Sequence, residues 1–460
     1  MANSKVFEWS IAIADNKSIQ ILGPQKHESK SIQLHDILAV NPLVVRVRSF
    51  LKKAWDLGVD DPRKGIHGLK VALAMTLISF FYYIKPLNGA FNGGDGNNAV
   101  WAVMTVVVVF EYTAGATLCK GLNRIGATLI AGFLALAVCL VAMETGRHKI
   151  VAVLKPVIMG VSLFVISAVA TYLRFIPYMK ARHDYGCMIF ILTYGLVLVS
   201  GYDEKIQNQK QLIYVTNVRI STIIFGSVLC IIVSVFVCPV WAGMDLHNLI
   251  SSNLNKLANS LESCVYEYFG HGDEESRKQL EDYKSVLNSK ASEESMSNHA
   301  RWEPAHGKFS FRHPWKMYVK IGASSRSCAY SVETLISRLD SKTQVPETIK
   351  NHVKTSCLTL SSSSSDVLRI LSTTVSTMTI PTEMDKAIKE MKNGVRQLQN
   401  DVESLPDLLI QTHTKHELLE VIPLVTFIYL LIEIASRIRD IIIVVEEFAE
   451  MAKFKLAEDE

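Results

Sequence analysis

The sequence is poor in charge and lacks the motifs of common soluble enzymes. Only 20% of its 460 residues are Asp, Glu, Lys or Arg, whereas 49% are apolar, which excludes a disordered chain. It contains no P-loop, no GxGxxG fingerprint, no GxSxG elbow, no HExxH pair and no CxxC pair. These absences argue against a nucleotide-driven pump, an enzyme, a metal site and a disulfide-stapled protein, and no cofactor is implied.

The charges are divided unevenly along the chain. Residues 1–243 hold 23 Lys+Arg and 13 Asp+Glu, and residues 244–460 hold 25 and 31. A basic, apolar first half is followed by an acidic, more polar second half, which gives no support to nucleic acid as a partner. The division predicts a cytosolic N-terminal segment over 1–60, a transmembrane domain over 61–243 and a cytosolic helical domain over 244–460.

Six apolar runs of membrane length account for the hydropathy of the first half. An α-helix needs about 20 apolar residues to cross a hydrocarbon core of about 30 Å, because backbone polar groups cannot stay unpaired in lipid. Short polar links separate the runs, so neighbouring helices should form antiparallel hairpins. The predicted spans are 66–84, 99–118, 122–143, 150–173, 185–202 and 218–241.

Basic residues in the short links predict the orientation of the spans. Lys and Arg gather before the first span, in the second link and in the fourth link, whereas the alternate links are poorer in them. Cytosolic links carry the excess of Lys and Arg in multi-pass proteins, so both termini should be cytosolic. Residues 1–13 lack the basic start and apolar run of a signal peptide.

A further apolar run over residues 421–445 is predicted to be a core helix of the cytosolic domain. As a seventh span it would place several charges in lipid, each costing roughly 2.5–3.5 kcal/mol. Apolar residues recur every three to four positions through the second half, which indicates a helical bundle. Its predicted helices follow the apolar line of residues 245–261 and cover 274–287, 315–339, 345–378, 383–405 and 414–454.

Two polar features interrupt that half. The serine run 361–365 is predicted to lie on a helix surface, with phosphorylation as a less favoured reading. The linker 301–315 contains Pro304, Pro314 and several aromatic residues, and it is predicted to clasp the bundle.

Ionisable residues inside the spans are candidates for a transport path, because charge is costly in lipid and usually faces a lumen. The segment NRIGAT at 123–128 resembles VRIST at 218–222, and each begins an apolar span. The echo predicts two related helical hairpins. Arg124 and Arg219 would then occupy equivalent positions, either at opposite membrane ends or meeting within the membrane, and would favour anions.

Two other ionisable residues in the spans have open interpretations. Lys70 could line the path or snorkel to the membrane interface. Glu111, a lone carboxylate, would pair with a nearby Lys or Arg, either beside the pore or in a structural ion pair.

The segments Trp101–Glu111 and Gly115–Arg124 resemble the signature of plant aluminium-activated malate transporters. The resemblance covers roughly residues 60–315. It implies an all-α membrane protein that conducts malate and other anions as a homodimeric channel, with six spans and a cytosolic helical bundle per subunit. Arg124 and Arg219 are its implied pore residues, with Lys120 and Lys70 as further basic positions. The same family pattern is present at Asp61–Lys64, Arg174–Pro177, Asp184–Gly186, Cys238–Gly243 and Trp302–Pro304.

Aluminium activation carries over less well than anion conduction. Aluminium is a hard cation that would seek outer-face carboxylates, and the candidates are Asp95, Asp203 and Glu204. Lys205 and Lys210 dilute the acidic charge of the third outer link. The resemblance favours the plasma membrane as the location, with the vacuolar membrane second.

Two other functions stay open at this point. A more distant likeness to bacterial fusaric-acid-type exporters supports a proton-coupled secondary exporter of organic anions, with Glu111 as the proton site. A non-conducting membrane scaffold would instead bind partners through its acidic cytosolic domain. Transport driven by a pH gradient would favour the exporter, and unitary currents independent of such a gradient would exclude it.

Overall fold

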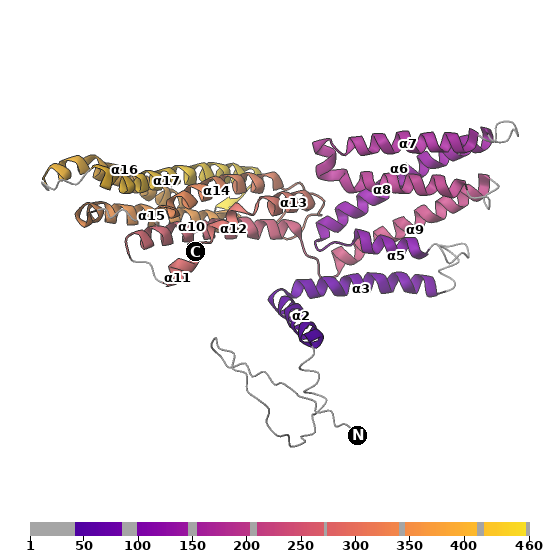
Figure 1. Ribbon diagram of the computed structural model, residues 1–460, viewed down its shortest axis with the longest axis horizontal. Helices are drawn as coiled ribbons and strands as arrows, with labels where there is room; N and C mark the ends of the chain where they lie inside the picture. Colours follow the sequence, from indigo (N-terminus) through magenta and orange to yellow (C-terminus); the bar gives the residue numbers. More distant parts are fainter. Residues whose placement is uncertain are drawn as a thin grey trace, which may run out of the picture. The chain divides into compact units, whose positions relative to one another are not determined.

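The computed structural model describes residues 42–84, 99–145, 154–202, 209–270, 274–339, 346–411 and 418–456, and nearly all of them are helical (Figure 1). The chain divides into two compact units, residues 1–65 and 66–460. The first unit contains α2 (Pro42–Asp60) and the start of α3 (Pro62–Tyr83). The Asp61 side chain accepts the backbone N–H of Arg63 at 3.2 Å, which caps α3 at its proline start.

Within the described residues, the membrane half contains five long helices and one short one. The long helices α3, α6, α7, α8 and α9 have the length and apolar composition of membrane spans, whereas α5 is shorter. Phe133, Phe164 and Phe236 are at least 76% exposed, which suits helices that face lipid. The bounds are α5 (Ala99–Val109), α6 (Ala114–Thr145), α7 (Leu154–Leu173), α8 (Pro177–Gly201) and α9 (Gln209–Phe236).

The predicted second span, 99–118, is wrong as a single helix. Helix α5 ends at Val109 and α6 begins at Ala114, so Glu111 lies in the turn between them rather than inside a span. The Thr117 hydroxyl closes this turn, because it accepts the backbone N–H of Glu111 at 3.0 Å and lies 3.2 Å from the Glu111 carbonyl oxygen. The apolar residues 114–118 therefore belong to the first turns of α6.

Helices α6 and α9 also begin earlier than the predicted third and sixth spans. Arg124 and Arg219 each lie ten residues after the start of their helix, which is about 15 Å along the helix axis. They do not open the apolar runs as the sequence suggested.

Close helix packing sets the direction of the membrane helices. Asn123 contacts His183 and Cys139 contacts Gly201, so α6 and α8 run parallel. Gly121 packs against Ile231 and Gly132 against Ile220, so α9 runs antiparallel to α6. Small residues on α6 allow these approaches, as expected of helices that associate in lipid.

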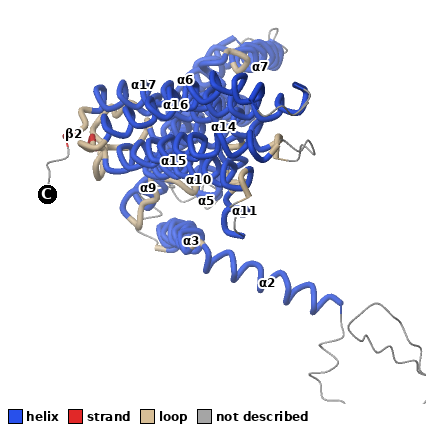
Figure 2. The backbone as a smooth tube through the Cα atoms, turned by 90° about the vertical axis from the view of Figure 1, so that its left-hand side faces the viewer, coloured by secondary structure: helices blue, strands red, loops and turns tan. Residues whose placement is uncertain are grey.

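The second half forms a helical bundle around one apolar core. The core runs through α10, α14, α15 and α17, and α16 packs on α15. Figure 2 shows that strand is confined to a short segment near the C-terminus, where β1 (Thr379–Ile380) pairs in parallel with β2 (Lys455–Leu456). The helices are α10 (Ala242–Tyr268), α11 (Glu274–Gln279), α12 (Tyr283–Leu287), α13 (Lys290–Ala300), α14 (Trp315–Ile336), α15 (Glu347–Thr377), α16 (Met384–Gln411) and α17 (Leu418–Ala452).

Helix α17 contains the apolar run that the sequence assigned to the bundle. By length and composition alone it qualifies as a membrane span. Its Phe427, Ile434, Ile438 and Phe448 side chains are nevertheless completely buried in the bundle core. Its Arg437 pairs with Glu433 at 2.7 Å on a partly exposed face. The core position of this helix is therefore confirmed.

Two details of the predicted bundle are wrong. Ser361 and Ser363–Ser365 are buried rather than on the surface, because small side chains let α15 approach α10 closely. The Ser365 hydroxyl donates to the Ala258 carbonyl at 3.0 Å across this contact. The predicted helix 274–287 is broken into α11 and α12, and α13 was not predicted.

The buried carboxylate of Glu303 joins the membrane half to the bundle. Its Oε1 accepts backbone N–H groups from Gly115 in α6 at 3.2 Å and from Ala242 in α10 at 2.6 Å, and its Oε2 accepts that of Gly243 at 3.0 Å. Its side chain is 1% exposed. Two positive helix ends therefore share one negative charge, and the clasp predicted for this linker is confirmed.

Opposing effects act on the protonation of this carboxyl group. Burial raises the pKa of Glu303, while the three backbone N–H donors and nearby His306 oppose that rise by favouring the ionised form.

The tight approach at Gly115 predicts that Gly115→Ala destabilises the protein. A Cβ there would lie 2.6 Å from the His299 carbonyl oxygen and 2.7 Å from Glu303 Oε1. We expect the free energy of unfolding to fall by about 1–3 kcal/mol, which is the usual cost of overpacking. Thermal unfolding of the full chain in detergent micelles measures the change.

Gly126→Ala on the same helix is the matched control, because a Cβ there has nothing within 4 Å. Alanine is the better helix former by about 1 kcal/mol, so this variant should match or exceed the wild type. If both variants were equally stable, the contact between Gly115 and Glu303 would have room for the added methyl group.

Candidate functional site

Arg124 is a buried cation with a neutral partner. Its side chain is 5% exposed, and its Nη1 donates to the Tyr185 hydroxyl of α8 at 3.1 Å. Its Nε is buried and has no hydrogen-bond partner among the described residues. Cys230 of α9 lies close enough to interact electrostatically with the guanidinium. Arg124 therefore sits among α6, α8 and α9 with a free donor.

Lys120, one turn before Arg124, faces the same tyrosine but is already neutralised. Its ammonium lies 5.5 Å from the centre of the Tyr185 ring and forms an ion pair with Glu111. Both members of the pair are about one-third exposed. Glu111 pairs with a nearby lysine, as predicted, and leaves Arg124 without a carboxylate.

Arg219 has a similar environment at another place in the helix group. Its guanidinium lies 4.9 Å from the Trp101 ring centre, and its Nη1 donates to Ser200 Oγ at 2.8 Å and to the Leu196 carbonyl at 3.3 Å. Its Nε is also buried without a partner in the described part of the chain. The polar partners of Arg219 are therefore all neutral.

The two arginines lie toward opposite ends of α8. Arg124 meets that helix at Tyr185 and Arg219 meets it at Ser200. Fifteen helical residues separate these two partners, which corresponds to about 22 Å. Of the two arrangements that the sequence left open, the structure has the arginines apart, because α6 and α9 run antiparallel and each arginine lies ten residues after the start of its helix.

Of the remaining predicted site residues, only Lys70 is described, and its neighbours are other than the two arginines. Lys70 is 3% exposed on α3, and His67 and Cys238 are its electrostatic neighbours. Asp95, Asp203 and Glu204 lie outside the described residues. Among the residues that are described, no group of three or more His, Cys, Asp or Glu side chains is placed to hold a metal ion.

Sequence reasoning missed the residues that position the two cations. Trp101 and Tyr185 appeared only within the family signatures, and Ser200 was not singled out. A polar or aromatic side chain at a helix position gives no local sign of a partner on another helix. Charge within the apolar spans, the repeated segment around Arg124 and Arg219, and the family signature pointed to the cations but not to these partners.

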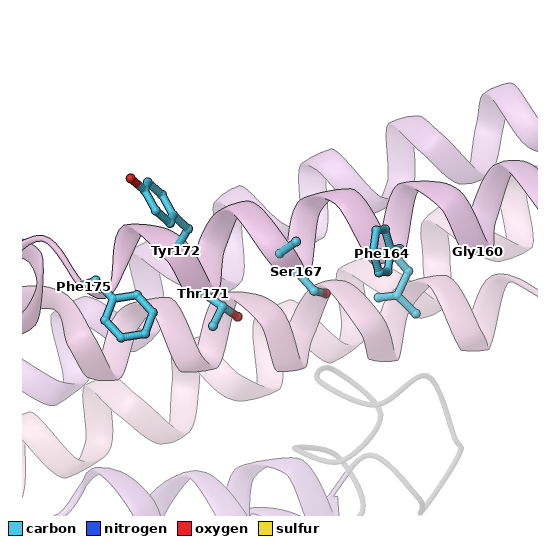
Figure 3. A pocket seen from close by; sticks show the side chains of 8 residues that line it. Gly160, Phe164, Ser167, Thr171, Tyr172 and Phe175 are labelled. Atoms are coloured by element: carbon cyan, nitrogen blue, oxygen red, sulfur yellow. The ribbon is translucent and has the colours of Figure 1, made fainter.

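One open hollow, about 670 Å³, lies on α7 and its following turn. Its lining runs from Gly160 to Phe175 and contains no Asp, Glu, Lys, Arg or His side chain. Figure 3 shows that the labelled side chains, among them Phe164 and Tyr172, come from this one segment. Such a surface suits lipid contact and offers no group for anion binding.

A neutral histidine network lies in the bundle core. His247 Nε2 contacts the Ser376 carbonyl at 3.0 Å, so it must carry the proton and leave Nδ1 to accept from the Tyr318 hydroxyl at 2.9 Å. His313 Nε2 then donates to the Tyr318 oxygen at 3.2 Å. Burial, with a smaller effect of His247, lowers the pKa of His313 to about 4.

Comparison with known proteins gives consistent similarities across the chain. Residues 55–418 match the sequence profile of the family described as aluminium activated malate transporter. Aluminum-activated malate transporter 10 of Arabidopsis thaliana is 42% identical and covers 97% of this chain and 94% of its own length. Aluminum-activated malate transporter 2 of Arabidopsis thaliana is 41% identical, and the match covers 89% of this chain and 79% of the relative. Aluminum-activated malate transporter 1 of Triticum aestivum is 39% identical, and the match covers 94% of this chain and 91% of the relative.

The neutral state of His313 predicts that acid destabilises the folded chain. The unfolded state binds the proton near pH 6.5 and the folded state only near pH 4, so stability is complete above pH 6.5 and falls between pH 6.5 and 4. The full loss amounts to about 3 kcal/mol at 1.36 kcal/mol per pH unit. Thermal unfolding from pH 7.5 to pH 4 measures it.

His313→Gln keeps a donor to Tyr318 but cannot titrate, so its unfolding temperature should depend less on pH. His352→Gln is the control, because His352 is exposed on α15 and bonded to Ser404. If His313→Gln kept the full wild-type slope, His313 would not be the group that titrates.

Proposed function

The chain belongs to the aluminium-activated malate transporter family, and from that premise we propose that it is a channel that conducts malate and other anions across a plant membrane. The observation that carries the proposal is the state of Arg124 and Arg219. Both are cations in the interior of the helix group, and neither has a carboxylate partner within the described residues.

An unpaired cation inside a membrane protein is costly, because it loses its hydration without gaining a counter-ion. A permeating anion would supply that counter-ion. The neutral partners Tyr185 and Ser200 orient the two guanidinium groups, and each buried Nε lacks a hydrogen-bond partner that an entering anion would supply. Neutral positioning also keeps each cation from being cancelled by a fixed carboxylate.

Two separated arginines suit conduction better than one deep binding site. An anion must bind well enough to enter and weakly enough to leave, which multiple sites along a path allow. Arg124 and Arg219 would each provide an anion-binding site, one toward each end of α8. Lys70 and Lys120 would add positive potential near the path, with Glu111 limiting the contribution of Lys120.

The orientation follows from the junction at Glu303. Because the start of α6 is joined to the helical bundle, a cytosolic bundle places Arg124 toward the cytosol and Arg219 toward the outer side. We propose this orientation with both termini cytosolic, and the plasma membrane as the location ahead of the vacuolar membrane. The domain boundaries remain those predicted, with a conducting domain over 61–243.

We further propose a homodimer, in which two subunits would bring four arginines to the conducting region. Activation by aluminium stays a prediction resting on Asp95, Asp203 and Glu204. No catalytic role is proposed for any residue.

Replacing either arginine is expected to reduce anion current. Arg124→Gln and Arg219→Gln each remove a charged hydrogen-bond donor worth about 1.5–3 kcal/mol, which corresponds to roughly ten- to hundredfold weaker anion binding. Voltage clamp of cells with malate, chloride or nitrate as the only permeant anion measures the current and its selectivity.

Arg396→Gln is the matched control, because Arg396 is exposed on α16 of the bundle. It should leave current and selectivity at wild-type values. If Arg124→Gln and Arg219→Gln both gave wild-type currents at equal surface expression, the two arginines would not line the conduction path.

A proton-coupled exporter is the second candidate, and Glu111 is the residue that favours it. Its carboxylate is about one-third exposed and lies within electrostatic reach of His67 and His299. A group in that position can exchange protons with water, unlike a fully buried carboxylate.

Glu111→Gln separates the two candidates. In a channel, this change frees Lys120 from its counter-charge, so anion current should persist or rise. In an exporter, uptake driven by a pH gradient should disappear. Malate flux into liposomes, with and without a pH gradient, distinguishes these results, and gradient-dependent flux abolished by the substitution would reverse our preference.

A further inference from the structure

A polar cleft between α13 and α14 lies on the cytosolic bundle, away from the two arginines of the proposed path. Its volume is about 460 Å³, which is within the range of small-molecule sites. Three of its lining residues are cations and one is an anion. The lining is Glu294, Ser297, Asn298, Arg301, Lys316, Val319, Lys320 and Ala323.

Two of the three cations have no acidic partner. Lys320 pairs with Glu447 of α17. Arg301 and Lys316 form no ion pair with any described residue, even though Glu294 lies in the same cleft. Arg301 is half-buried at the end of α13, where water cannot fully compensate its charge. The cleft therefore holds uncompensated positive charge.

A second arginine increases the charge imbalance. Arg182 of α8 lies close enough to Arg301 to repel it electrostatically. Burial, together with this repulsion, lowers the pKa of Arg301. Arg182 is held by Tyr178, whose hydroxyl is 3.2 Å from Nη1 and whose ring centre is 4.9 Å from the guanidinium carbon. Two like charges from the membrane half and the bundle are thus kept side by side.

We propose that this cleft binds a phosphate monoester, with Arg301 and Lys316 as its main ligands and Arg182 at its rim. Such a group carries nearly two negative charges at neutral pH and three strong acceptor oxygens. A guanidinium can bind it through two parallel N–H donors, and an ammonium binds it as a point charge. The Glu294 carboxylate opposes any bound anion, and the two cations of the lining that have no acidic partner, Arg301 and Lys316, outweigh it.

The bound phosphate links the two halves of the protein. A phosphate bound at Arg301 would offset the repulsion that Arg182 of the membrane half exerts on that guanidinium. The phosphate can come from a soluble metabolite or from the headgroup of a phosphorylated lipid, since Arg182 lies near the start of α8. Either source stabilises the contact between the membrane helices and the bundle.

Thermal unfolding of the full chain tests this site without any measurement of transport. The protein is titrated in detergent with glycerol phosphate, and sodium chloride at equal ionic strength serves as the reference. In parallel, it is reconstituted into phosphatidylcholine nanodiscs with or without phosphatidylinositol phosphate. We expect a saturable rise in unfolding temperature with phosphate in at least one of these two arms, and the responding arm identifies the source.

Arg301→Gln and Lys316→Gln should each weaken the phosphate response at least tenfold. Arg301→Gln should also leave the unfolding temperature without phosphate at or above the wild-type value, since it relieves the repulsion with Arg182. Lys392→Gln, an exposed lysine on α16, should respond like the wild type. Lys316 is exposed, so its variant decides the matter if Arg301→Gln folds poorly.

Either of two results would overturn the proposal: no response beyond that to chloride in both arms, or full responses in both cleft variants. Arg124→Gln should keep the phosphate response whatever happens to its anion current. Failure of the cleft and failure of the proposed channel are therefore separable.

Discussion

A single carboxylate, that of Glu303, joins the starts of a membrane helix and of a bundle helix. It accepts backbone N–H groups at the starts of α6 and α10, whose helix dipoles would otherwise place two positive ends together. Because α6 starts at this junction, the distance of Arg124 from Glu303 along the helix sets where Arg124 lies in the membrane half. The position of a cation in the membrane half thus depends on a residue in the linker of the bundle. Gly115 must lack a side chain for this contact to form.

The second constraint is electrostatic. An arginine withdrawn from water is normally matched by a carboxylate, yet the buried Arg124 and the half-buried Arg219 are oriented by a phenol, a hydroxyl, a carbonyl and an indole ring. Among the described residues, Glu111 is paired with Lys120 rather than with either arginine. Under the proposed function, the unpaired positive charge would favour anions over cations without a tight binding site. The spacing along α8 divides this charge between two places rather than concentrating it in one.

The sequence predicted the membrane half well because apolar composition and length carry most of the information about spans. It also placed α17 in the bundle, since charges such as Arg437 are too costly in lipid. It failed where local composition misleads: residues 114–118 look like the end of a span, and the serines at 361–365 look solvent-exposed. The partners of Glu303 and of the two arginines come from distant segments, so no local pattern could reveal them.

In the proposed channel, the permeating anion supplies the counter-ion that Arg124 and Arg219 lack. The most direct test is the reversal potential of the purified protein in a planar bilayer with a malate gradient and an impermeant cation. If the protein is a malate-conducting channel, the current reverses near the malate equilibrium potential and shifts with the malate gradient. A current that reverses near the equilibrium potential of added potassium, or flux that requires a pH gradient, would contradict it.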